Sequence, residues 1–199
     1  MKSRAAVAPA CMLAAMETSR DLLLYCRAGF ERECAQEISA AEAATRTRCD
    51  IGFVEAQLSP AVETNELRGL LDWRRLIFAR QCLPVFARID GLSRTDRLAP
   101  IIAALNDRSE AYFDVWVEAP DTDAGKALAS FCRSFGNALI GGLKKARLLT
   151  PGGNPSARSP SAPGRSPSAA EAMDGRERPP RLHVFFPQSD KVYLCSADP

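Results

Sequence analysis

Short apolar runs alternate with amphipathic stretches along the first third of the chain. The run Leu22–Cys26 is bounded by charged residues and ends at Ala28-Gly29, which is typical of a buried strand that enters a turn. Apolar residues then recur at every fourth position from Phe30 to Ile38, so a helix is expected there. The segment Cys49–Leu58 alternates between apolar and polar residues and predicts one further strand.

The middle of the chain predicts a helix, an interrupted strand pair and a second helix. Helical spacing is found over Glu66–Trp73 and again over Asp96–Leu105. Between them lie two extended runs, Leu76–Arg80 and Leu83–Ile89. Proline at position 84 favours an edge strand or a bulge, because it lacks the N–H group that a central strand needs.

The clearest strand is Tyr112–Glu118, where apolar and polar side chains alternate strictly. The acidic turn after it can cap a helix that runs to Phe135, and a second helix is expected over Asn137–Leu148. Residues 151–180 are more than half Pro, Ser and Gly, which predicts a flexible insert. The runs Leu182–Phe186 and Val192–Cys195 close the chain as a β-hairpin, so the insert lies inside a domain.

This order of elements predicts an α+β fold with two small sheet-and-helix layers. The chain has 199 residues, 46% of them apolar and 25% charged, which fits one or two soluble domains. A formal charge of +2 supplies no strong field for polyanions, so nucleic-acid binding would depend on local clustering of basic residues. No stretch of about 20 apolar residues is present, so no membrane contact is expected.

The cysteine pattern argues for a reducing compartment and against a metal site. Seven cysteines are scattered without a Cys-x-x-Cys pair, and His183 is the one histidine. Reduced thiols in a cytoplasmic protein are therefore expected, with no metal. Residues 1–20 look superficially like a secretory signal, but Pro9 interrupts the apolar part, so we expect a dispensable flexible leader, with Met12 or Met16 as a possible natural start.

Two motifs could carry chemistry, and their context argues against both. Pro151-Gly152-Gly153 could bring backbone amides close to a nucleoside, but it follows a basic helix end and precedes the insert instead of a helix. His183 has no nucleophile in a local motif and is expected to be a strand residue packed against a neighbour. No catalytic residue and no bound cofactor are predicted for this chain.

Basic residues are the stronger functional signal. Two consecutive helices folded as a hairpin could bring their basic side chains to one surface and dock phosphates, although an ordinary solvated face explains them equally well. The strongest candidates for RNA binding are Arg133, Lys144, Lys145 and Arg147, with Lys126 and Arg80 as weaker ones.

Four segments together resemble the bacterial 23S rRNA cytidine 2'-O-ribose methyltransferases of the RlmM type. The first is the opening strand, turn and helix, Leu24–Ile38, and the order and spacing of the other three also fit. Those three are Leu76–Gln81, the stretch from Val117 to Phe135, and His183–Phe186.

The resemblance implies the N-terminal part of such an enzyme: a ferredoxin-like subdomain over residues 21–90 and a THUMP-like RNA-binding domain over residues 91–199. Large-subunit rRNA would be the partner. The family's Rossmann-like domain, which binds S-adenosylmethionine and transfers the methyl group, is expected to lie outside this chain and to act in cis or in trans. The chain alone is then expected to be catalytically silent.

Two features depart from the family pattern, namely the Ala-rich leader and the insert over residues 151–180. Both are tolerable as surface additions. Two other classes of function stay open from the sequence. One is a non-catalytic α+β module for protein interaction or small-molecule sensing, and the other is a complete enzyme of unrecognised chemistry.

Overall fold

The computed structural model describes residues 21–40, 44–59, 76–150 and 179–197. Within these ranges, one mixed seven-stranded sheet has the strand order β2-β3-β1-β4-β7-β6-β5. The predicted α+β class is confirmed, but the two small separate sheets are not, because β4 pairs with strands of both halves. The leader, the predicted helix at 66–73 and nearly all of the insert lie outside the described residues.

The first half of the described chain, which we call the ferredoxin-like half after its sequence resemblance, begins with a strand and a helix. Strand β1 (Asp21–Cys26) leads through Gly29, whose φ is +96°, into helix α1 (Glu31–Ala40), as the sequence predicts. The single strand predicted over 49–58 is wrong: β2 (Ala44–Asp50) and β3 (Phe53–Leu58) form a hairpin. Its turn depends on Gly52, which has a φ of +85°, a backbone conformation that residues other than glycine rarely adopt.

Strand β4 (Ala79–Ile89) replaces the two extended runs that Pro84 was expected to separate. Its first part pairs with β1 as far as Val85, and from Val85 onward it pairs with β7 (Lys191–Ala197). Pro84 therefore lies where one ladder gives way to the next, a position where a missing N–H costs little. Of the two predicted alternatives, the edge strand is wrong, because β4 lies between β1 and β7. A bulge is present two residues after Pro84, at Phe86, the extra residue opposite Leu194 and Cys195.

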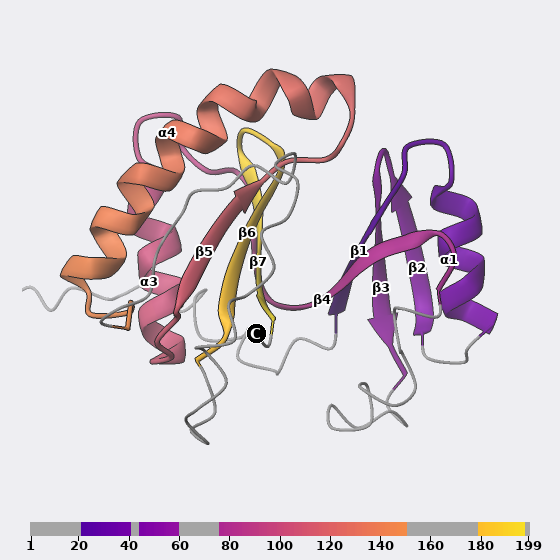
Figure 1. The fold of residues 1–199 in the computed structure, drawn as a ribbon, viewed down its shortest axis with the longest axis horizontal. Coiled ribbons are helices and arrows are strands. Elements are labelled where there is room, and N and C mark those ends of the chain that lie inside the picture. The colour runs from indigo at the N-terminus through magenta and orange to yellow at the C-terminus, as the bar shows by residue number, and fades with distance from the viewer. Residues whose placement is uncertain (1–20, 41–43, 60–75, 151–178, 198–199) are drawn as a thin grey trace, which may run out of the picture.

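The second half places two helices on one face of its strands (Figure 1). Helix α3 (Leu98–Arg108) and strand β5 (Asp114–Glu118) occur where expected. Helix α4 (Asp123–Lys145) is a single helix, so the expected helix hairpin broken near Asn137 is wrong. Strand β6 (Arg181–Gln188) pairs in parallel with β5 and in antiparallel fashion with β7, which confirms the terminal hairpin.

Three apolar cores hold these layers together. The first lies between α1 and the strands of the ferredoxin-like half, and the second lies between α3, α4 and the strands of the other half. The third joins the two half-sheets through their remaining faces. Phe53 of β3 meets Phe185 of β6 edge-on at 5.2 Å between ring centroids, although these strands are not neighbours in the sheet. The sheet is thus folded back on itself about β4 (Figure 1).

The start of α4 is fixed by a side-chain cap. Thr122 Oγ1 accepts a hydrogen bond of 3.0 Å from the backbone N–H of Gly125. Gly125 itself packs so closely that a Cβ there would come within 1.8 Å of the Pro120 carbonyl oxygen. The acidic turn predicted to cap this helix is therefore confirmed.

Replacing Thr122 with alanine should lower the free energy of unfolding by about 1 kcal/mol, because a helix donor then loses its partner. Urea denaturation followed by circular dichroism measures the change. Thr122→Ser is the matched control, since its hydroxyl can still accept the bond. Equal stability of the alanine and wild-type chains would show that the cap contributes nothing.

Candidate nucleic-acid interface

Helix α4 carries most of the predicted RNA-binding residues, but along its length instead of in one cluster. Lys126, Arg133 and Lys144 are all exposed and are separated by 7 and 11 residues. At 100° per residue these positions lie within about 20° of one another around the helix axis. They form a stripe that extends about 27 Å from Lys126 to Lys144 at 1.5 Å per residue.

The two weaker candidates are both neutralised by acidic residues. Lys126 Nζ lies 2.9 Å from a carboxylate oxygen of Asp123, and each group shifts the pKa of the other, that of Asp123 downward and that of Lys126 upward. Arg80 lies 3.0 Å from Asp121, an ion pair that joins the start of β4 to the loop before α4. Because both pairs are exposed, they hold little energy, but they leave little net charge for a phosphate.

The C-terminal end of α4 is different, because its basic residues have no acidic partner within the described ranges. Lys144, Lys145 and Arg147 are all exposed. The helix dipole places about half a negative charge at this end. Three full positive charges within four residues exceed what is needed to offset it, so a local positive field remains. We call this group, Lys144, Lys145 and Arg147, the basic end of α4.

The chain leaves α4 through a tight reversal at the basic end. The N–H of Leu148 donates to the carbonyl of Leu143 at 2.9 Å, and the N–H of Arg147 donates to that of Lys144 at 3.2 Å. This pair of bonds is the Schellman arrangement, and the buried side chains of Leu143 and Leu148 complete it. Arg147 has a φ of +59°, at the position where glycine is the usual residue.

A buried polar network that cannot be read from the sequence links β1, β5 and β6. Glu118 Oε2 accepts a hydrogen bond of 3.0 Å from the Tyr25 hydroxyl and lies 2.9 Å from His183 Nδ1. His183 is fully buried, and its ring packs edge-to-face with that of Trp116, with 5.3 Å between the ring centroids. The prediction that His183 is a packed strand residue is confirmed. Burial, with the neighbouring Glu118 charge, raises the pKa of Tyr25, so its hydroxyl remains a donor.

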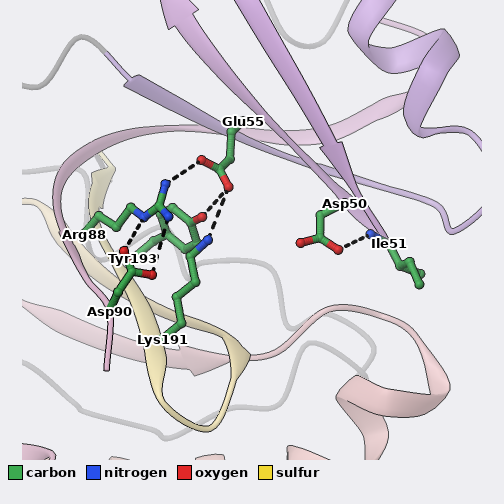
Figure 2. A network of polar contacts seen from close by, with 7 residues as sticks. All are labelled: Asp50, Ile51, Glu55, Arg88, Asp90, Lys191 and Tyr193. Atoms are coloured by element: carbon green, nitrogen blue, oxygen red, sulfur yellow. Dashed lines mark hydrogen bonds and ion pairs between the residues drawn. The ribbon is translucent and has the colours of Figure 1, made fainter. Parts of the chain in front are cut away.

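A second polar network joins the two halves at the edge of their shared core (Figure 2). Glu55 of β3 accepts a hydrogen bond from the Tyr193 hydroxyl, and its carboxylate lies 3.3 Å from Arg88 and 3.5 Å from Lys191. Arg88 also pairs with Asp90 at 2.8 Å. Together with the buried network, these contacts fix the ferredoxin-like half against the other half.

The sequence predicts neither a metal nor a cofactor for this chain. No group of three or more His, Cys, Asp or Glu side chains there is arranged to hold a metal ion, and the six cysteines in these ranges are free thiols. Pro151-Gly152-Gly153 lies outside the described residues. No described helix combines the length and apolarity needed to cross a membrane.

Comparison with known proteins gives family matches over both halves. Residues 19–83 match the model of the RlmM ferredoxin-like domain, and residues 96–159 match that of the N-terminal region of ribosomal RNA large subunit methyltransferase M. The protein of that name from Xanthomonas oryzae pv. oryzae (strain PXO99A) is 43% identical over 183 residues, covering 89% of this chain and 45% of the relative. The one from Xanthomonas campestris pv. campestris (strain B100) is 44% identical with the same coverage.

Among solved structures, that of TrmN from Thermus thermophilus aligns with a TM-score of 0.46 and 16% sequence identity, over 88% of this chain and 44% of that one. The chain spans less than half the length of the curated relatives it matches. Since the two family models together cover most of the chain, it belongs to the ribosomal RNA large subunit methyltransferase M family and matches the N-terminal part of its members.

Proposed function

We propose that this chain is the RNA-binding N-terminal part of an S-adenosylmethionine-dependent 23S rRNA (cytidine 2'-O-ribose) methyltransferase. In this proposal, the chain holds large-subunit rRNA in position while another domain transfers the methyl group. The observation that carries it is the basic end of α4, three exposed cations without acidic partners in the described ranges, on a chain of this family. Lys and Arg clusters of this kind bind the sugar-phosphate backbone.

The two halves would have different roles. We assign the ferredoxin-like unit to residues 21–90 and a THUMP-like RNA-binding unit to residues 91–199, with α4 as its main contact element. The basic end of α4 supplies the strongest contacts in this proposal, followed by Arg133. Lys126 and Arg80 contribute less, because each would have to leave a carboxylate to reach a phosphate.

Cofactor binding and catalysis belong, in this proposal, to the part of the relatives that this chain does not match. Isothermal titration of the chain with S-adenosylmethionine should then give no binding, and the chain should transfer no methyl group. A saturable signal at micromolar cofactor would contradict this division of labour. The protein is expected to act in the cytoplasm, where ribosomal RNA is modified.

Equilibrium titration tests RNA binding directly. The full chain is titrated against a folded fragment of large-subunit rRNA at about 50 mM and about 200 mM salt, with an unrelated structured RNA as competitor. We expect binding that weakens at the higher salt and that favours the rRNA fragment. Absence of binding at the lower salt would refute the proposal.

One observation favours a protein-interaction role as the second candidate. Three large apolar side chains stay exposed in the described part of the chain, Phe30, Ile51 and Ile77, at 42%, 67% and 82%. The Glu31 carboxylate joins the turns that precede Phe30 and follow Ile51, and Phe30 stacks on Phe78 beside Ile77. The three therefore lie at one end of the ferredoxin-like half. If the RNA titration shows no binding, this end of the ferredoxin-like half becomes the favoured site, as a surface that binds another protein.

A further inference from the structure

Two residues at the C-terminal end of α4 contradict the local rules for a stable helix. Gly141 lies within the helix, where glycine costs about 1 kcal/mol relative to alanine. Arg147 occupies the left-handed position that glycine normally takes. Both lie within four residues of Lys144, and neither departure has a packing explanation in the contacts of the described residues.

Comparison with Gly125 and Gly142, two of the other glycines in α4, shows why Gly141 stands out. A Cβ at Gly125 would collide with Pro120, and one at Gly142 would lie 3.2 Å from Ile102. At these two positions, a close neighbour explains why the residue is glycine. A Cβ at Gly141 would meet nothing within 4 Å, and the residue is exposed. Packing within the protein therefore gives no reason for the missing side chain.

The surroundings of Gly141 give a reason of another kind. Lys144 and Lys145 are three and four residues further along, and Asn137 is four residues before, so these exposed side chains surround Gly141 on the helix surface. Glycine without a packing role is used where a ligand approaches the backbone closely. Residues that destabilise the local structure concentrate at functional sites.

We propose that Gly141 is the point where the sugar-phosphate backbone of the RNA comes into contact with α4. Lys144 and Lys145 bind phosphates on either side of the approach. The Schellman hydrogen bonds hold Arg147 in its left-handed conformation, and an arginine stands there in place of glycine because it reaches the same strand of RNA. This inference rests on the proposed RNA binding and adds a contact that no charge-based argument identifies.

Gly141→Ala should change stability and binding in opposite directions. Alanine should raise the melting temperature by about 2–4 °C, since about 1 kcal/mol of helix propensity is gained in a chain of this size. RNA binding should weaken about fivefold or more, because the added methyl group is forced into a close contact. Arg147→Gly should follow the same pattern, because glycine suits the left-handed position and removes the arginine's contact with RNA.

Two control variants separate the possible outcomes. Gly141→Leu should weaken binding further than Gly141→Ala, whereas Ala127→Leu places the same side chain on the exposed surface of α4 far from the basic end and should leave binding unchanged. If Gly141→Ala binds as tightly as wild type while Lys144→Ala/Lys145→Ala binds less tightly, the inference is overturned and the proposed function stands. If the wild-type chain itself binds no RNA, both fail. A drop in melting temperature for Gly141→Ala would also overturn it, by revealing a structural need for glycine.

Discussion

The double replacement Lys144→Ala/Lys145→Ala should weaken binding to folded RNA by on the order of 10- to 100-fold at about 0.1 M salt. The reason is counterion release: each phosphate contact contributes about 0.7 to 0.9 to the slope of log K against log salt concentration. Losing two contacts should therefore reduce the magnitude of the slope by about 1.5. Titrations at four or five salt concentrations measure affinity and slope together. The loss should be similar for different RNA sequences, because phosphates carry no sequence information.

Lys126→Ala is the matched control, since it removes one exposed lysine from the same helix. Lys126 already pairs with Asp123, so its removal should change the affinity much less than the removal of either lysine at the basic end. The assignment of the basic end is wrong if the double variant keeps the wild-type salt slope. Circular dichroism should show both variants folded, because these side chains are exposed and outside all three cores.

His183→Ala should have the largest effect on stability, lowering the free energy of unfolding by about 3–5 kcal/mol. The change removes the buried partner of the Glu118 carboxylate and opens a cavity beside Trp116. Glu118 would keep only the Tyr25 hydroxyl as a donor among the contacts described above. Urea denaturation gives the value. The folded fraction at low temperature should still bind RNA as wild type does, because His183 is fully buried and cannot touch a ligand.

Tyr25→Phe provides a milder variant of the same network. It removes one hydrogen bond to Glu118 while the aromatic ring can keep its contact with Phe185, at 4.8 Å between centroids. The expected loss is about 1–2 kcal/mol, the cost of withdrawing one donor from a buried charged acceptor. A His183→Ala chain as stable as wild type, or one that is stable yet loses RNA binding, would contradict a purely structural role for this histidine.

Local elements of this fold could be predicted from the sequence because each depends on neighbouring residues. The opening strand and helix, α3, β5 and the terminal hairpin all follow from periodicity and turn residues. The hairpin over 44–58 was missed because one glycine inside an alternating pattern was taken as part of a strand. Gly52 was the available signal, since an isolated glycine in such a pattern marks a turn or bulge.

Interactions between distant segments could not be predicted in this way. Tyr25 and Glu118 are 93 residues apart, and nothing local to either reveals that the sheet folds back and brings them together. The same limit applies to α4. The lysines at 126, 144 and 145 and Arg133 were correctly placed on helical structure, whereas Arg147 lies just beyond the end of α4. The expected break near Asn137 would have grouped all of these basic residues on one surface. In one continuous helix, only the basic end remains clustered.

Mapping of RNA cross-links on the full chain tests the central claim most directly. A large-subunit rRNA fragment carrying photoreactive nucleotides is irradiated with the chain at low salt, and the linked peptides are identified by mass spectrometry. We predict cross-links concentrated in residues 137–148, which include Gly141 and the basic end of α4, and lost on addition of unlabelled rRNA fragment. Specific cross-links confined to the ferredoxin-like half, with none on α4, would contradict the account.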